Sequence, residues 1–329
     1  MSISKVFRSV PCIPRLAGIL VVAFAQAALA QSYPVKPVRM LVPAAAGGVS
    51  DIAARAMFPL LSQALGQQVI GENRVGANGN IGTEYCAKVA ADGYTACFLQ
   101  GTLVAINPLA YASVPFNMER DFAPVVHLNW FESAIVVNAA VPANNLRELM
   151  DLARAKPGIL NWGSIGIGSS SHLYLEWFQA KTGASFNHIP YKSNPELLQA
   201  AINGDVPAML NTPGATLQLA KAGKLRVLGV INRRSALLPD VPTLGEQGYD
   251  LDFRNWNAIF FQKNVSSDII QRWNAESNRI VRDSQWEEKF LRPASLSSSG
   301  GTPDDLAQIV RKSQATAAEL VKLAKLRFE

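Results

Sequence analysis

Short apolar runs rich in valine, isoleucine and phenylalanine alternate along the chain with segments in which apolar residues return every three to four positions. The first pattern is typical of buried strands and the second of amphipathic helices. Strands are predicted at residues 38–43, 68–72, 94–99, 134–137, 159–162, 188–190, 208–211, 225–230 and 258–261. This alternation predicts an α/β fold built from mainly parallel sheets flanked by helices.

Several of the predicted helices carry start signals. Ser50-Asp51, Asn144-Asn145 and the serines at 169–171 each precede a helical pattern, and Thr302-Pro303 supplies an N-cap and a first helical position. The segment from Pro303 onward predicts one long amphipathic helix, with its apolar face formed by Leu306, Ile309, Val310, Ala317, Leu320 and Leu323.

The length of the chain predicts two lobes, because 329 residues exceed one ordinary domain. The chain has no Gly/Pro/Ser-rich linker between two contiguous halves, so we expect it to cross between the lobes on strands, near 130–133 and 253–257. Residues 31–132 plus 255–329 would form lobe 1, and residues 133–254 would form lobe 2.

The first thirty residues have the pattern of a secretory signal peptide. Lys5, Arg8 and Arg15 lead into an apolar run that ends Ala28-Leu29-Ala30, and the segment has no acid. A membrane anchor is the alternative, but it requires about 18 continuous apolar residues, and this run is shorter. We therefore expect an exported protein cleaved after Ala30.

The charge of the chain excludes some partners. The full sequence has 31 basic and 25 acidic residues, and removal of the signal peptide leaves 28 against 25, a net charge of +3. Nucleic-acid binding requires a basic stripe or cluster, whereas the pair Arg233-Arg234 stands alone. A weak preference for anionic ligands remains.

Two cysteines, Cys86 and Cys97, remain after cleavage. One lies on a predicted helix and the other on the strand that follows it, so a disulfide is geometrically possible, and two buried free thiols are an equal alternative. No histidine or CxxC motif lies near them, and the chain has no HExxH, paired His/carboxylate or calcium-loop motif. We therefore expect no metal.

The stretch from Met40 to Arg55 predicts an anion-binding loop. An apolar strand ends at the paired Gly47 and Gly48, and a helix starts behind Ser50 and Asp51. Glycines let backbone N–H groups approach a ligand, and the helix start adds about half a positive charge.

A second glycine-rich segment, residues 74–82, also follows a predicted strand. Its GxxGxxG spacing differs from the dinucleotide fingerprint, so no cofactor is expected. Because it follows a parallel strand, it would stand beside the first loop, with Asn78 and Asn80 as candidate ligand contacts. A packing turn in which only glycine fits is the alternative.

A third loop, from Trp162 to His172, contains three consecutive serines before a helix, and these would also suit an anion. An exported hydrolase with Ser169 as nucleophile and His172 as base is the alternative. However, the G-x-S-x-G elbow is not matched around Ser164, and no acid stands at a familiar spacing from His127, His172 or His188.

Later strand ends add Tyr191, Lys192 and Asn211, which either reach the same cleft or are ordinary loop residues.

Many short motifs occur in the order known from one family. Over the whole mature chain the sequence resembles the Bug-type receptors, the extracytoplasmic solute-binding proteins of tripartite tricarboxylate transporters. The matching segments are Tyr33-Pro-x-Lys-Pro-Val-Arg39, Gly47-Gly48-x-x-Asp51-x-x-Ala-Arg55, Glu72-Asn-Arg74, Asp92-Gly-Tyr-Thr95, Asp121-Phe-x-Pro124, Gly163-Ser-x-Gly-x-Gly-Ser169, Pro190-Tyr-Lys192 and Leu238-Pro-Asp-Val-Pro-Thr243.

The resemblance implies a periplasmic binding protein of the type II-like, two-lobed α/β architecture that closes on a small carboxylate, such as a di- or tricarboxylate, an acidic amino acid or an aromatic acid. It implies no catalysis, and as partners it implies transporter subunits or a sensor. The ligand-binding residues it implies are Ala45, Ala46, Gly47, Gly48, Val49, Asp51, Asn78, Thr102, Ser164, Gly168, Ser169, Ser170, His172 and Asn211.

The chain departs from the family pattern at several places. Residues 44–46 are three alanines where an aromatic residue and prolines are usual, Val75 replaces a usual proline, and Asn78 replaces a usual glycine. Residues 256–263 also lack the usual glycine and proline pattern. The alanines predict a roomier pocket wall.

Overall fold

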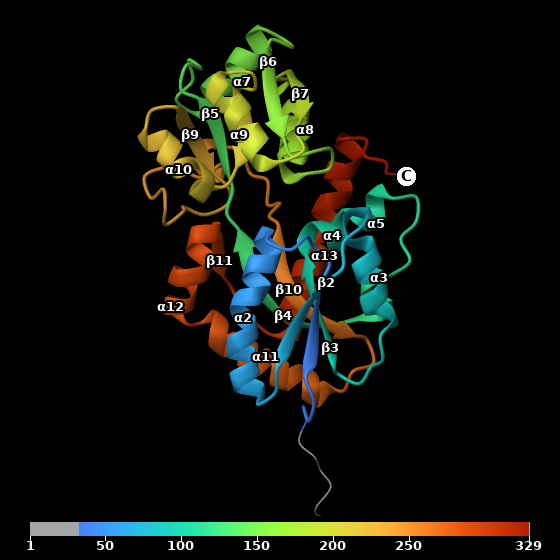
Figure 1. Ribbon diagram of the computed structural model, residues 1–329. Helices are drawn as coiled ribbons and strands as arrows, with labels where there is room; N and C mark the ends of the chain where they lie inside the picture. The colour runs from blue at the N-terminus through green and yellow to red at the C-terminus, as the bar shows by residue number, and fades with distance from the viewer. Residues whose placement is uncertain (1–32, 329) are drawn as a thin grey trace, which may run out of the picture.

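The computed structural model describes residues 33–328, and the predicted signal peptide, residues 1–30, lies outside them. Two lobes are stacked one above the other, each with a sheet covered by helices (Figure 1). This is the two-lobed α/β fold predicted from the strand–helix alternation.

The first lobe contains a six-stranded sheet in the order β11-β4-β10-β3-β1-β2. Strand β1 pairs in parallel with β2 and β3, and the remaining pairs, β3–β10, β10–β4 and β4–β11, are antiparallel. The strands are β1 (Val38–Val42), β2 (Val69–Asn73), β3 (Thr95–Gln100), β4 (Phe122–Phe131), β10 (Trp256–Gln262) and β11 (Leu296–Ser298).

The second lobe contains a five-stranded sheet in the order β7-β6-β8-β5-β9. Strand β6 pairs in parallel with β7 and β8, whereas β5 is antiparallel to both β8 and β9. Its strands are β5 (Ala134–Asn138), β6 (Leu160–Ser164), β7 (Phe186–Pro190), β8 (Ala208–Asn211) and β9 (Leu225–Val230).

Every predicted strand is present, and most strands of each sheet run in one direction, as expected. Both sheets are nevertheless mixed, because β10 and β11 oppose the other strands of the first sheet and β5 opposes those of the second. Strand β4 leaves the first lobe and β10 enters it, so the two must run in opposite directions. The prediction also missed β4 and β11. Strand β4 carries Pro124 and the polar His127 and Asn129, which hide its pattern, and β11 is short.

Along the chain, the helices lie in the segments that connect the strands. In the first lobe they are α2 (Val49–Leu65), η1 (Ala77–Gly79), α3 (Asn80–Lys88), α4 (Gly101–Ala105), α5 (Asn107–Ala110), α6 (Met118–Asp121), α11 (Ser267–Val281), α12 (Ser284–Trp286), η3 (Glu287–Leu291), η4 (Arg292–Ala294) and α13 (Pro303–Leu323). In the second lobe they are α7 (Leu146–Ala155), α8 (Ser170–Thr182), α9 (Asn194–Asn203), α10 (Pro213–Lys221) and η2 (Gly245–Gln247).

Three of the four predicted helix starts are confirmed. Asn145 caps α7, Ser169 caps α8, and Thr302 forms a capping box with Asp305 at the start of α13. The fourth differs, because α2 has Gly48 as its N-cap and Ser50 and Asp51 lie inside its first turn.

Helix α13 contacts both lobes. Its first half packs on β4 of the first lobe and its second half packs on α8 of the second (Figure 1). Ala317, Leu320 and Val321 accordingly belong to the core cluster of the second lobe. The chain also crosses between the lobes twice. It leaves the first lobe where β4 continues into β5, and it returns through the segment before β10. The predicted lobe boundaries themselves stay a prediction.

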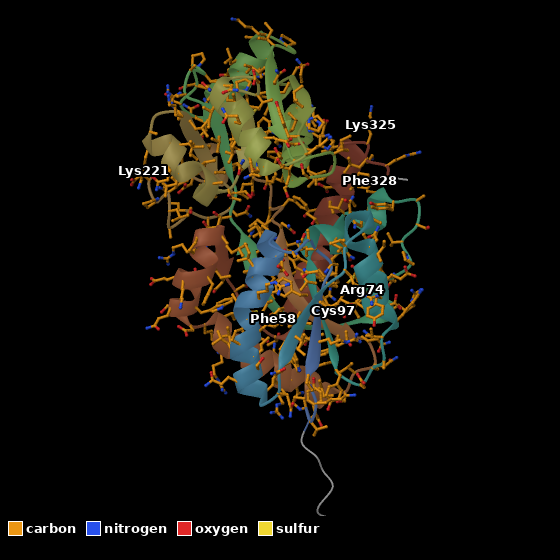
Figure 2. All side chains as sticks on the ribbon, in the orientation of Figure 1. Phe58, Arg74, Cys97, Lys221, Lys325 and Phe328 are labelled. Atoms are coloured by element: carbon orange, nitrogen blue, oxygen red, sulfur yellow. A yellow bond between two sulfur atoms is a disulfide. The ribbon has the colours of Figure 1, made fainter. Side chains whose placement is uncertain are left out.

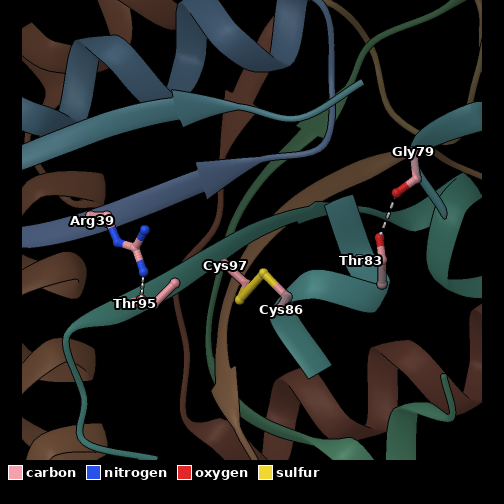
Figure 3. The surroundings of a disulfide bond; sticks show 6 residues. All are labelled: Arg39, Gly79, Thr83, Cys86, Thr95 and Cys97. Carbon is pink, nitrogen blue, oxygen red and sulfur yellow. Dashed lines mark hydrogen bonds between the residues drawn. A yellow bond between two sulfur atoms is a disulfide. The ribbon is translucent and has the colours of Figure 1, made fainter. Parts of the chain in front are cut away.

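The two cysteines are joined in a disulfide, which settles the alternatives left open by the sequence. Cys86 of α3 and Cys97 of β3 are fully buried, with Cα atoms 6.2 Å apart. The bridge fastens α3 to the sheet face next to β1 (Figure 3). Because α3 follows the second glycine-rich segment, the bridge also anchors that loop.

Within residues 33–328, no helix combines the length and the hydropathy that crossing a bilayer requires.

Candidate functional site

A cleft of about 530 Å³ lies where the two lobes meet. On the lobe 1 side it is lined by segments at the carboxyl ends of β1, β2 and β3, which share one edge because these strands are parallel. On the lobe 2 side it is lined by the loop between β6 and α8, here called the serine loop, residues 164–170. Six predicted site residues line it: Ala45, Asn78, Thr102, Gly168, Ser169 and Ser170.

The prediction missed most of the remaining lining. The polar residues that it missed are Gln100, Asn107 and Asn255, and the missed apolar side chains include Val75, Leu103, Ile106, Phe131, Ile165, Ile167 and Phe328. Gln100 and Asn255 could have been found as polar residues at a strand end. Of the described residues, none that lines this cleft has a charged side chain.

Asn255 is oriented by the backbone around it. Its Oδ1 accepts hydrogen bonds from the Thr102 N–H and the Trp256 N–H, both at 3.0 Å. Two backbone donors on one oxygen fix which end of the amide is which. The amide nitrogen of Asn255 is therefore left to donate toward the cleft, at the point where the chain returns to lobe 1.

Asn107 holds the second glycine-rich segment in place. Its side-chain nitrogen donates to the Asn78 carbonyl at 3.0 Å and to Asn80 Oδ1 at 2.7 Å. Asn78 has a left-handed backbone with φ of 52° and lines the cleft, whereas Asn80 is buried. Of the two asparagines singled out in this segment, Asn78 thus reaches the cleft and Asn80 supports it.

The first glycine loop is arranged differently from the expectation, because its amide groups have acceptors within the chain. The Gly47 N–H donates to Asp51 Oδ2 at 2.8 Å, and the Gly48 N–H donates to the Ala45 carbonyl at 3.1 Å. Among the predicted residues of this loop, only Ala45 lines the cleft, and Ala46, Gly47, Gly48, Val49 and Asp51 do not.

Asp51 holds this loop in place through side-chain hydrogen bonds. Its side chain is buried, and it accepts hydrogen bonds from Arg55 Nε at 2.7 Å and from Asn73 Nδ2 at 2.8 Å. Burial acts to raise the pKa of Asp51, but these hydrogen bonds and that of Gly47 outweigh it and lower the pKa below its ordinary value. Asp51 is therefore an ionised structural anchor.

Ser164, the last residue of β6 and the first of the serine loop, is fully buried. Its hydroxyl is 2.6 Å from His188 Nε2 on the neighbouring strand β7, and it also accepts from the Gly166 N–H at 3.1 Å. Burial lowers the pKa of His188. Ser164 therefore positions the loop instead of lining the cleft.

The structure does not bring Ser169 and His172 together as a nucleophile and a base. The Ser169 hydroxyl accepts from the His172 backbone N–H at 3.4 Å, as an N-cap does. In the His172 ring, Nδ1 accepts from the Gly168 N–H at 3.2 Å, so the proton of the neutral ring sits on Nε2, 3.6 Å from Glu176 Oε1.

Burial and the stacked His188 ring lower the pKa of His172 to about 4. The neutral ring therefore has no free nitrogen with which to take a proton from Ser169.

Asn211 is also outside the cleft lining. It is buried at the end of β8, where its amide donates to Asn194 Oδ1 and accepts from the Thr212 N–H, both at 2.8 Å. Tyr191 and Lys192 do not line the cleft either. Among residues 33–328, no cluster of three or more His, Cys, Asp or Glu side chains is arranged to hold a metal ion.

The fold, with two lobes around a cleft that presents neutral polar groups from both sides, is that of a solute-binding protein. The family described as "Tripartite tricarboxylate transporter family receptor" matches residues 53–326. The chain belongs to this family of solute-binding receptors.

Individual relatives agree with this assignment. Protein BugT of Bordetella pertussis is 33% identical over 277 residues, which cover 83% of each chain. Among solved structures, the Rpa4515 protein of R. palustris with adipate is 29% identical with a TM-score of 0.76, covering 90% of this chain and 99% of that one. A TctC solute binding protein from Polaromonas has a TM-score of 0.78 at 25% identity, covering 88% of this chain and 99% of that one.

Proposed function

We propose that this protein is a periplasmic receptor that captures a small carboxylate in the cleft between its lobes, by lobe closure. The observation that carries the proposal is the cleft itself. Hydroxyl and amide groups from both lobes line it, and no charged side chain of the described chain does. The similar structure of the Rpa4515 protein, which was solved with adipate, supports a carboxylate as the ligand class.

The carboxylate would be met by neutral donors and by a helix start. Ser169 and Ser170 lie at the N-terminus of α8, where unsatisfied N–H groups and the helix dipole favour an anion. Across the cleft, the Asn255 amide and the Thr102 hydroxyl are the donors of lobe 1. Hydrogen bonds to an ionised acceptor are roughly twice as strong as neutral ones.

The glycine loop would act indirectly in this scheme. The Gly47 N–H donates to Asp51 and the Gly48 N–H donates to the Ala45 carbonyl, so neither is free for a ligand. We therefore propose that the loop's role is to place Ala45 at the cleft wall. The lobes would be residues 31–132 with 255–329, and residues 133–254, and they would move about the two crossing strands.

We further propose that the protein is not an enzyme. A serine hydrolase would need a base within hydrogen-bond reach of the Ser169 hydroxyl. Both nitrogens of His172 are directed elsewhere, to the Gly168 N–H and to Glu176. The second serine–histidine pair, Ser164 and His188, is closed from the cleft because Ser164 is fully buried.

The signal-peptide pattern supports export to the periplasm with cleavage after Ala30. Membership of the receptor family supports membrane subunits of a tripartite tricarboxylate transporter as the partner, with a sensor protein as the alternative.

A matched pair of variants tests the site. Ser170→Ala removes a cleft hydroxyl at the first position of α8, and Ser267→Ala removes an exposed hydroxyl at the first position of α11, far from the cleft. We expect Ser170→Ala to weaken adipate binding about tenfold, since one charge-assisted hydrogen bond is lost. Isothermal titration calorimetry on the mature protein would measure the dissociation constants.

The Ser267→Ala control should bind adipate as the wild type does. Equal adipate affinities in the wild type and in Ser170→Ala would remove α8 from the proposed site. Release of a hydrolysis product from an ester of adipate, abolished by Ser169→Ala, would favour the hydrolase.

A further inference from the structure

The segment that follows α13, residues 324–328, returns to the cleft. Phe328 lines the cleft, and its N–H donates to the Ala110 carbonyl at 2.7 Å. Its ring lies 5.0 Å from the ring of Tyr111, with which it also forms a parallel β-bridge. Figure 2 shows Phe328 on the side of the molecule where the two lobes meet.

Phe328 also contacts the serine loop of the other lobe. A Cβ atom at Gly168 would lie 2.6 Å from Cζ of the Phe328 ring, so a larger residue there would displace the ring. Gly168 also has φ of +80°, a backbone conformation that glycine adopts without strain. One aromatic ring thus touches the Ala110–Tyr111 segment of lobe 1 and the serine loop of lobe 2.

The serine loop adds two isoleucines to the same cleft. Ile165 and Ile167 line it, and 56% and 61% of their surfaces remain exposed. Large apolar side chains gathered on a cleft wall are typical of a surface that an apolar ligand body covers. A ligand composed only of carboxylate and hydroxyl groups would leave them in contact with water.

We propose that Phe328, Ile165 and Ile167 form an apolar compartment that selects carboxylates with an aromatic ring over short aliphatic dicarboxylates. This inference rests on the proposed function, because it assumes that the neutral donors of the cleft hold the carboxylate. The compartment then holds the remainder of the ligand, and Phe328 is its specificity-determining residue. Aromatic pairs favour edge-to-face or offset contacts, which the Phe328 ring offers to an aromatic ligand.

Succinate and phenylsuccinate test the compartment, since they differ only by one phenyl ring. Calorimetric titration of the wild type should give phenylsuccinate an affinity about tenfold or more above that of succinate. Phe328→Ala should abolish most of this ratio by weakening phenylsuccinate binding, and Phe328→Leu should restore part of it. The ratio within one protein is insensitive to a partly unfolded sample.

Leu323→Ala is the matched control, because it truncates an exposed apolar residue of α13 that does not line the cleft. It should keep the wild-type ratio. If succinate and adipate bind but the ratio is near one, or if Phe328→Ala leaves it unchanged, the compartment is disproved while the proposed function stands. If no carboxylate binds the wild type, both fail.

Discussion

His127 lies in an environment very different from that of a free histidine side chain in water. It is fully buried on β4, its ring centroid lies 4.3 Å from that of Trp130 with the two rings tilted by 44°, and neither ring nitrogen has a hydrogen-bond partner among the described residues. Burial, with a smaller contribution from the charge of Arg254, lowers the pKa of His127 to about 3. The ring is neutral in the folded protein at neutral pH.

This environment predicts that the protein becomes less stable as the pH is lowered. In the unfolded chain a histidine titrates near pH 6.5, so below that pH the unfolded state binds more protons than the folded state. The contribution is present above pH 6.5 and is lost toward pH 3. We expect the free energy of unfolding to fall by about 1.4 kcal/mol per pH unit for His127 between pH 6 and 5.

Urea denaturation at several pH values measures this slope. His172, with a pKa of about 4, adds to it in the same window and with the same sign. His127→Phe keeps a planar ring against Trp130 and removes the titration, so the slope of this variant should be smaller by the contribution of one histidine. Identical slopes for the wild type and His127→Phe would contradict the assignment.

At the scale of the element, the disulfide joins α3 to β3 across 11 residues of sequence. A closed loop of this length restricts the unfolded chain, and the restriction is worth about 3 kcal/mol. Replacing both Cys86 and Cys97 by serine should therefore lower the free energy of unfolding by about that amount. Chemical denaturation measures this difference, and adding a reductant should lower the free energy of unfolding of the wild type to that of the variant. A difference below about 0.5 kcal/mol between the oxidised wild type and the variant would contradict the prediction.

Elements were the part of the structure that the sequence predicted best. The predicted strands are short apolar stretches, several of them with one polar residue inside, and the caps at Asn145, Ser169 and Thr302 depend only on residues three positions away. Strand β4 was missed because its inward polar residues pair with a distant strand: Asn129 accepts a hydrogen bond from Asn257. The mixed pairing of the sheets depends on the crossing between lobes, which no local pattern encodes.

At the scale of the whole molecule, the prediction of a cleft at the strand ends is supported by the geometry, and six of the predicted ligand-binding residues line that cleft. Glycine loops were correctly placed at one sheet edge, because parallel strands bring their carboxyl ends together. The local sequence could not indicate that Asp51 occupies the Gly47 amide. It also gave no signal for Phe328, which reaches the cleft only through the path of α13.

Carboxylate capture at this cleft can be tested with matched pairs of charged and neutral ligands. Succinate, adipate and phenylsuccinate should be titrated calorimetrically into the mature wild type beside their diamides, which keep the shape and lose the charge. We predict saturable binding of at least one diacid, with its diamide weaker by about a hundredfold, because two charge-assisted interactions are lost. Equal binding of diacid and diamide, or no binding by any diacid, would contradict the account.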